Sequence, residues 1–225
     1  MNKKSIFLLI CFSLVVFIIG CSGNSKKPVN PPDPILSPSA ENLIRNGDFE
    51  LDLVGDEEGW GRWGIYFYYY DTVSEENPPP TLERCTDPEE STNHILRFYA
   101  LDCGVKDWHQ QITPLKMDSE MLEGEPQYFE FELKTDKDYF ISLKARSDKP
   151  GGRIYASLND ATTGNFEHYG GYLINTTTVF TTYTKFIMKG NGKKVRFSLN
   201  LGNDLGVNTN NDVNFSIDDV KVLEQ

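Results

Sequence analysis

The stretch Tyr139-Phe-Ile-Ser-Leu-Lys-Ala-Arg146 alternates apolar and polar side chains along the chain. Successive side chains of a β-strand point to opposite faces, so the pattern predicts a strand with one buried and one polar face. The same alternation recurs in residues 153–159 and 195–201, and residues 215–223 form a further strand-like stretch at the end of the chain. Glycine-containing turns separate these stretches, which favours antiparallel strands joined by short connections.

The rest of residues 42–225 adds strands but no convincing helix. Only residues 117–123 have the composition of a short helical turn, and residues 71–93 are acidic and proline-rich, which predicts a long loop. Many short antiparallel strands in a domain of this length predict an all-β fold, an antiparallel β-sandwich of the jelly-roll type.

The N-terminus predicts export. Lys3 and Lys4 precede an apolar run from Ile6 to Ile19, which has the length of a signal-peptide core and is short for a membrane span. The run ends in Gly20-Cys21, which resembles the lipobox of bacterial lipoproteins. That resemblance implies lipidation at Cys21, whereas an uncleaved anchor helix is the alternative.

Three segments follow from this interpretation. Residues 1–20 are a lipoprotein signal peptide, residues 21–41 are a lipid-anchored, proline-rich spacer, and residues 42–225 form the sandwich. We expect the chain in the cell envelope, at the outer membrane or cell surface, and attached to the membrane through lipid only.

Charge narrows the class of partner. Residues 1–20 hold two lysines and no acidic residue, so their removal leaves 20 basic residues against 33 acidic ones, a net charge of −13. Such a domain repels nucleic acid and anionic lipid, and no nucleic-acid partner is expected.

Two cysteines stay in the exported domain. Cys85 and Cys103 form an even pair in an oxidising compartment, which favours a disulfide between them. Two free, buried thiols are the alternative.

The domain opens on Asn42-Leu-Ile-Arg-Asn-Gly-Asp-Phe-Glu50, soon followed by Gly59-Trp60. This opening resembles that of the family 4/9 carbohydrate-binding modules, which have a galactose-binding-like jelly roll. Further similar stretches follow in the family's order, at residues 107–112, 137–146, 181–184, 195–202 and 215–220. The long 71–93 segment and the strand-like residues 127–133 depart from the family's pattern. The resemblance implies a concave sheet that holds a polysaccharide or oligosaccharide, and a structural calcium ion.

The alternation also indicates which residues line such a groove. Sugar rings stack on aromatic rings, and their hydroxyls pair with amides and guanidinium groups. If the apolar residues face the core, the opposite strand faces offer these binding candidates: Gln111, Arg146, Tyr155, Asn159 and Asn200. A merely solvated strand face has a similar composition and is the alternative.

Trp63 and Tyr66 are two further candidates for sugar stacking. The run Tyr66-Phe-Tyr-Tyr-Tyr70 cannot be buried throughout, because its side chains alternate between faces. Exposed aromatic residues mark binding sites. The alternative is that Trp60, Phe67 and Tyr69 belong to the core and the others contact loops.

The calcium candidates are Glu50, Asp218 and Asp219. They lie near the two ends of the domain in sequence, and terminal strands of such sandwiches often pair. Carboxylate oxygens suit Ca²⁺, although acidic residues at strand ends are also commonly just solvated.

Catalysis is not expected. The three histidines lack metal-ligand spacing, and no serine-nucleophile, zinc-protease or phosphate-binding motif is present. Non-catalytic carbohydrate binding is the favoured hypothesis. An adhesion or assembly lipoprotein with an envelope protein partner is the alternative, and a small polysaccharide hydrolase or lyase ranks lower.

Overall fold

The structure is a computed structural model that describes residues 37, 40–51, 53, 62–67, 78–104, 106, 109–116, 128–162, 168–203 and 210–225. The chain separates into two compact units, Met1–Pro32 and Asp33–Gln225, and every described residue lies in the second. The predicted signal peptide and Cys21 lie outside the described residues. The predicted helical turn at 117–123 belongs to the second unit but also lies outside the described residues. No helix among the described residues is long and apolar enough to cross a membrane.

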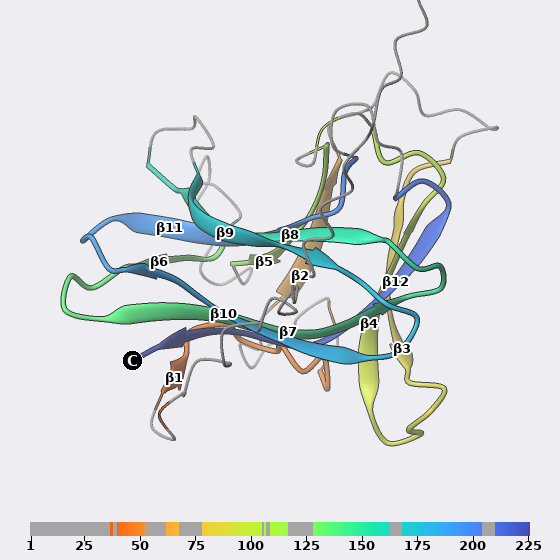
Figure 1. Ribbon diagram of the computed structural model, residues 1–225, viewed down its shortest axis with the longest axis horizontal. Coiled ribbons are helices and arrows are strands. Elements are labelled where there is room, and N and C mark those ends of the chain that lie inside the picture. Colours follow the sequence, from red (N-terminus) through yellow and green to blue (C-terminus); the bar gives the residue numbers. More distant parts are fainter. Residues whose placement is uncertain are drawn as a thin grey trace, which may run out of the picture. The chain divides into compact units, whose positions relative to one another are not determined.

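The second unit is built from β-strands (Figure 1). They are β1 Glu41–Asn42, β2 Arg62–Phe67, β3 Thr81–Thr86, β4 His94–Ala100, β5 Gln110–Leu115, β6 Glu130–Glu132, β7 Asp138–Ser147, β8 Arg153–Asp160, β9 His168–Asn175, β10 Thr181–Lys189, β11 Lys194–Asn200 and β12 Val213–Glu224. The strand-like stretches 139–146, 153–159, 195–201 and 215–223 are confirmed as parts of β7, β8, β11 and β12.

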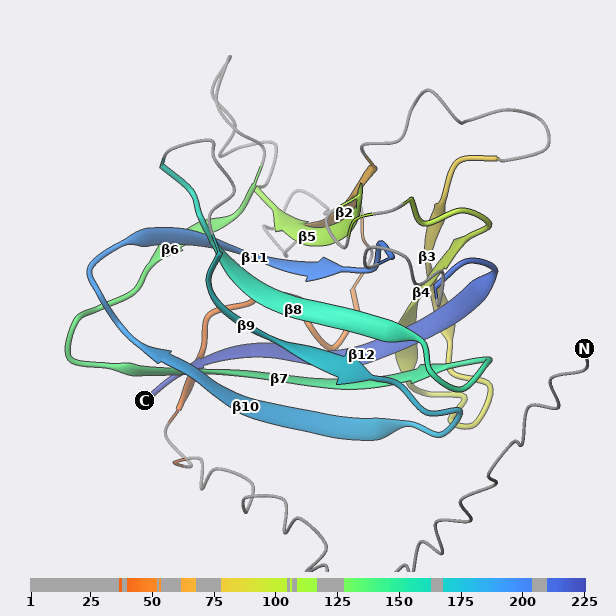
Figure 2. The same cartoon turned by 45° about the horizontal axis from the view of Figure 1, so that its top comes forward.

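These strands form two antiparallel six-stranded sheets. The β7 sheet has the order β10-β7-β12-β4-β3, with β1 paired to β12, and the β11 sheet has the order β2-β5-β11-β8-β9, with β6 paired to β11. The turned view shows β8, β9 and β11 as one layer and β7, β10 and β12 as the other (Figure 2). The predicted all-β sandwich is confirmed.

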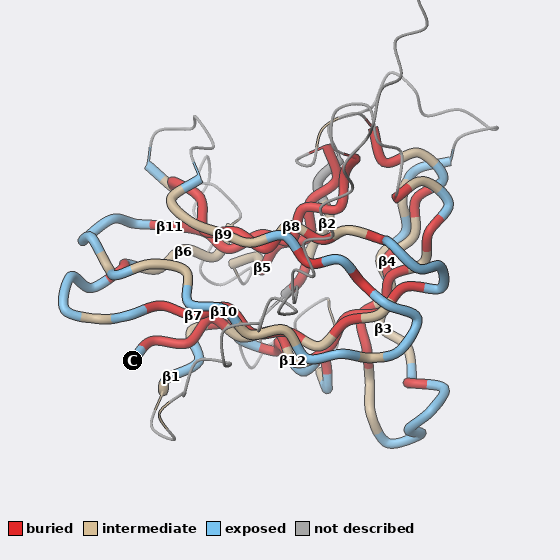
Figure 3. Tube along the Cα trace, in the orientation of Figure 1, coloured by how far each residue is buried: buried red, intermediate tan, exposed pale blue. Residues whose placement is uncertain are grey.

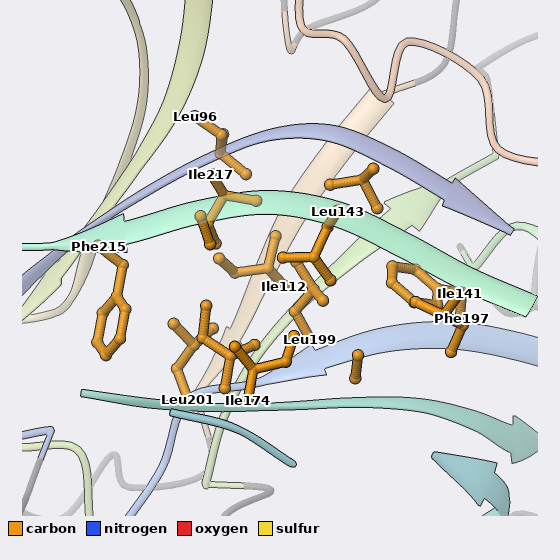
Figure 4. Close-up of a cluster of buried hydrophobic side chains, with 14 of the residues drawn as sticks. Leu96, Ile112, Ile141, Leu143, Ile174, Phe197, Leu199, Leu201, Phe215 and Ile217 are labelled. Atoms are coloured by element: carbon orange, nitrogen blue, oxygen red, sulfur yellow. The ribbon is translucent and has the colours of Figure 1, made fainter. Parts of the chain in front are cut away.

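The core lies between the two sheets. Ile141 and Leu143 of β7 face Ile112 of β5 and Phe197 and Leu199 of β11, and all five are fully buried (Figure 4). Burial follows the central strands of both sheets, while the turns are exposed (Figure 3). Because the inner positions of each strand are filled by this core, the alternate positions project from the outer faces of the sandwich.

A bulge keeps β12 apolar toward the core over its whole length. Its register against β7 shifts between Asp218 and Lys221, and Asp219 has a φ of 50°. Phe215 and Ile217 are in the core before the bulge, and Val220 and Val222 are in it afterwards. The extra residue therefore changes the phase of the strand and turns the second half inward.

The predicted 71–93 loop is wrong for residues 81–86, which form β3. This strand pairs with β4 along its whole length and lies at the edge of the β7 sheet. Edge strands are commonly polar, and Leu82 is its one large aliphatic residue, so the alternation signal was weak.

The predicted disulfide between Cys85 and Cys103 is also wrong, since both cysteines are free. Cys85 lies opposite Ile95 near the start of β4, whereas Cys103 follows the end of that strand at Ala100. The five steps from Ile95 to Ala100 span roughly 16 Å of extended chain. A disulfide requires Cα atoms within about 7 Å of each other. Burial raises the pKa of the Cys103 thiol to about 12.

Candidate functional site

The outer face of the β11 sheet carries a layer of polar side chains. Strands β5, β11 and β8 supply these residues in adjacent rows: Gln111, Thr113, Ser157, Asn159, Arg196, Ser198 and Asn200. Each is at most 4% exposed. The face is therefore polar yet shielded from water. Buried polar groups require hydrogen-bond partners, so these side chains must bond to one another or to the backbone.

Hydrogen bonds connect this layer into one network. Gln111 Nε2 donates to Asn200 Oδ1 over 2.7 Å, and Asn200 Nδ2 donates to Ser157 Oγ over 2.9 Å. Asn159 Nδ2 donates to Ser198 Oγ over 2.6 Å, and the two serine hydroxyls lie 3.2 Å apart. The amides are thereby held in fixed orientations across three strands, which preorganises their donors and acceptors.

An aromatic pair borders the network toward β9. The ring centroids of half-buried Tyr155 and exposed His168 lie 5.5 Å apart, at 82° to each other. Between them Gly171 is the register partner of Ser157, so the β9 backbone is bare at this point. A Cβ at Gly171 would come within 2.5 Å of the Ala156 carbonyl oxygen. The result is a flat strip of backbone next to an accessible aromatic ring.

A second aromatic contact lies toward β6. The guanidinium of Arg196 stacks over the Tyr128 ring at 4.3 Å from its centroid. Arg196 also has Asn159 as its register partner on β8, so the stacked pair continues the polar layer.

Four predicted binding residues are brought together here. Gln111, Tyr155, Asn159 and Asn200 share the outer face of the β11 sheet. Their burial excludes a fully solvated face as the explanation for Gln111, Asn159 and Asn200. Tyr66 is the register partner of Gln111, and its side chain lies outside the described part of the chain.

Arg146 does not belong to this face, contrary to the prediction. It lies on β7 in the other sheet and projects from the opposite outer face. Its guanidinium pairs with Asp87 at 3.6 Å and with Glu89, and it stacks over Phe180 at 4.4 Å. Alternation assigns Arg146 to an outer face but does not say to which sheet.

Trp63 is a core residue, and its predicted role in sugar stacking is wrong. It is 4% exposed and packs edge-on against Phe49 and Phe197, with centroid distances of 5.1 and 6.4 Å. Its indole Nε1 donates to the Asn46 carbonyl oxygen over 3.0 Å. Ile65 on the same strand is the register partner of core residue Ile112, so Trp63 and Ile65 share the inward face of β2.

Both carboxylate oxygens of Glu50, a predicted calcium ligand, interact with His94. Its Oε1 accepts from the His94 backbone N over 2.9 Å, and its Oε2 lies 3.0 Å from His94 Nδ1. The backbone hydrogen bond from His94 is the main reason that the Glu50 pKa is lowered. The guanidinium of Arg84 takes the adjoining carbonyl oxygens of Phe49 and Glu50, over 2.6 and 2.7 Å.

Asp218 and Asp219 each lie near a lysine. Asp218 Oδ2 accepts from Asn93 Nδ2 over 3.1 Å and lies 3.8 Å from Lys144 Nζ, and burial raises the pKa of this carboxyl. Asp219 pairs with Lys221 at 3.3 Å. Within the described residues no three His, Cys, Asp or Glu side chains are grouped to hold a metal ion. Glu50, Asp218 and Asp219 therefore do not fit the predicted calcium site, and calcium elsewhere stays a prediction.

Two members of the face were missed from the sequence. Thr113 follows Gln111 by two positions, so alternation alone could have found it; its Oγ1 donates to the Phe197 carbonyl oxygen over 2.7 Å. His168 begins β9, whose Gly170-Gly171 pair lowers the strand signal.

Comparison with known proteins supports the architecture. No family model matches the sequence, and no curated protein matches it. A solved structure described as "CBM4 structure and function" superposes with a TM-score of 0.56 at 20% identity, over 81% of this chain and 99% of that one. A family 11 carbohydrate-binding module from Clostridium thermocellum gives a TM-score of 0.47 at 13% identity, over 84% and 97% of the two chains. The first likeness shows that the chain has the jelly-roll fold of a carbohydrate-binding module.

Proposed function

We propose that this chain is a non-catalytic carbohydrate-binding protein whose binding face is the outer face of the β11 sheet. The observation that carries the proposal is the preorganised network of amide and hydroxyl groups beside the accessible ring of Tyr155. Amides and hydroxyls match the donors and acceptors of a sugar, and an aromatic ring matches the apolar face of a sugar ring. The fold shared with the CBM4 structure supports the same class of function.

Access to the face begins at its β9 border. Tyr155 is half-buried and His168 is exposed, whereas the network amides are shielded from solvent. A glycan therefore first contacts the aromatic pair and the bare backbone at Gly171.

We also propose that the N-terminus directs this chain to the cell envelope. The apolar run 6–19 and the lipobox-like Gly20-Cys21 support export and lipidation, with the sandwich held outside the membrane by a proline-rich spacer. Replacement of the anchor cysteine, Cys21→Ser, is expected to shift the chain from the membrane fraction to the soluble fraction. Membrane attachment that survives the replacement would favour an uncleaved anchor helix.

Affinity gel electrophoresis tests the binding face. We would run Asp33–Gln225, the unit that contains all the described strands, in gels with soluble β-glucan, xylan, mannan or α-glucan. We expect retardation by at least one polymer and its loss in Tyr155→Ala. Phe186→Ala is the matched control, since this half-exposed ring lies on the other sheet.

The outcomes separate the alternatives. Equal retardation of Tyr155→Ala and the unaltered protein would place any glycan site elsewhere. No retardation by any polymer, with a normal melting curve, would favour a protein partner in the envelope. Release of reducing sugar during incubation with a polymer would show a hydrolase.

A further inference from the structure

The outer face of the β7 sheet holds a second polar feature. Ser216 of β12 is the register partner of Arg97 on β4 and also of Arg146 on β7. The three side chains thus stand in one row across three strands. Neighbouring strands lie about 4.8 Å apart, so the arginine Cα atoms are roughly 10 Å apart with a small serine between them.

A hollow of about 410 Å³ opens over this row. Its lining consists of Arg97, Arg146, Ser147, Asp148, Thr178, Asn214 and Ser216. This volume falls within the range of about 300–1,000 Å³ that small-ligand sites occupy. The hollow lies on the opposite side of the core from the amide network, so the two features share no residue.

The two guanidinium groups differ in freedom. Arg146 is fixed by Asp87, by Glu89 and by the Phe180 ring beneath it, and only 14% of its side chain is exposed. Arg97 is 39% exposed and touches Glu83 over a long 3.4 Å contact. One guanidinium is therefore prepositioned, and the other has donors left for a ligand.

The acidic groups near the hollow are either engaged or at its rim. Asp148 accepts from the Asn214 backbone N over 2.9 Å and from its Nδ2 over 2.8 Å. Glu83 and Glu89 are both more than half exposed, so water solvates them when a ligand carboxylate takes their place. Exposed ion pairs of this kind contribute little, which lowers the cost of the exchange.

We propose that this hollow binds the carboxylate of an acidic saccharide, a uronic acid residue. Guanidinium groups pair with carboxylates through two parallel hydrogen bonds. The neutral lining residues Ser216, Asn214 and Thr178 offer hydroxyl and amide partners for the sugar's own hydroxyls. The described lining residues include no aliphatic or aromatic side chain of the kind that anchors a peptide, so a saccharide is the better match.

Gel retardation in about 0.15 M salt, which screens the protein's net negative charge, tests this site with polygalacturonate and alginate. We expect both uronate polymers to retard Asp33–Gln225, and methyl-esterified polygalacturonate, which has the same backbone without the charge, to leave its mobility unchanged. Arg97→Gln should weaken the retardation at least tenfold. Lys185→Gln removes the same charge from an exposed position on β10 and should have no effect.

Further variants keep the result decisive. Arg97→Lys retains the charge but loses the two-pronged geometry, so it should bind more weakly than the unaltered protein. Tyr155→Ala should bind polygalacturonate normally, which distinguishes this site from the proposed neutral-glycan face. The proposal is overturned if neither uronate polymer retards the protein, if Arg97→Gln binds normally, or if the methyl ester or polyglutamate binds equally well.

Discussion

Asn210 is the residue on which the junction between β8 and β11 depends. It is fully buried; its Oδ1 accepts from the Arg153 backbone N over 2.8 Å, and its Nδ2 donates to the carbonyl oxygens of Arg153 and Leu201 over 2.7 Å each. Asn210→Ala leaves these backbone groups without that partner. Each buried unpaired group costs about 1–3 kcal/mol, so we expect a loss of about 3 kcal/mol in the free energy of unfolding.

Urea denaturation measures this loss. Asn191→Ala is the control, because Asn191 accepts only a solvent-exposed turn hydrogen bond among the described residues. An Asn210→Ala protein as stable as the control would mean that water replaces the amide.

The two cysteines should differ in reactivity. Burial raises the pKa of both thiols, and Cys103 is fully buried whereas Cys85 is only half-buried. The thiolate is the reactive form, so we expect iodoacetamide to label Cys85 slowly and Cys103 only after unfolding. Mass spectrometry of peptides prepared without reductant checks this, and a linked Cys85–Cys103 peptide would contradict it.

At the residue scale, alternation predicted which side chains share a strand face but not which sheet a strand joins. It placed Gln111, Asn159 and Asn200 correctly, because their strands are neighbours in one sheet. It misplaced Arg146, since sheet membership of β7 depends on long-range pairing. Trp63 was misplaced because its burial depends on contacts with Phe49 and Phe197, which are distant in sequence.

At the element scale, the segment 44–51 is held to β3 and β4 by hydrogen bonds with Arg84 and His94. Arg84 donates to two of its carbonyl oxygens, and such charged hydrogen bonds contribute about 1.5–3 kcal/mol each at most. Arg84→Met should therefore lower the melting temperature, and Arg84→Lys should restore part of the loss. Since His94, Lys144 and Lys221 contact the predicted calcium ligands Glu50, Asp218 and Asp219, any effect of EDTA on the melting temperature should be the same in Asp219→Asn as in the unaltered protein. A drop with EDTA that Asp219→Asn abolishes would contradict this arrangement.

The same segment should be sensitive to acid. Hydrogen bonds from His94 hold the pKa of Glu50 below its ordinary value of 4.5, so the folded state favours the ionised form. That stabilisation is complete above the unfolded pKa and is lost as the pH falls through the folded one. The difference in stability between the unaltered protein and Glu50→Gln should therefore be present above about pH 4.5 and shrink below it. A difference that does not change with pH, measured by denaturation from pH 7 to pH 3, would exclude the carboxylate as its source.

Strand predictions succeeded where both the core and the sequence pattern were strong. The alternating stretches of β7, β8 and β11 each bury three or more residues in the core cluster. By contrast, β3 is a polar edge strand and β9 is interrupted by two glycines, so tertiary pairing rather than local pattern defines them. The β12 bulge coincides with a break in the sequence alternation at Asp218-Asp219, where the apolar positions shift from 215 and 217 to 220 and 222.

At the scale of the whole molecule, the sandwich separates two polar outer faces by one apolar core. The amide network belongs to the β11 sheet, and the hollow at Arg97 and Arg146 belongs to the β7 sheet. Stacked sheets lie about 10 Å apart, and the described residues of the two features lie on opposite outer faces. Substitutions at separated sites without shared partners usually add within about 0.5 kcal/mol.

Binding at the two faces should therefore be independent. In the double variant Tyr155→Ala/Arg97→Gln, neutral-glycan retardation should equal that of Tyr155→Ala, and uronate retardation should equal that of Arg97→Gln. A saturating neutral glycan should also leave the uronate affinity within about twofold, since ligands couple only when they bias a shared conformational change. A larger shift in either direction would show that the core transmits a rearrangement between the sheets, and the two faces would then act as one site.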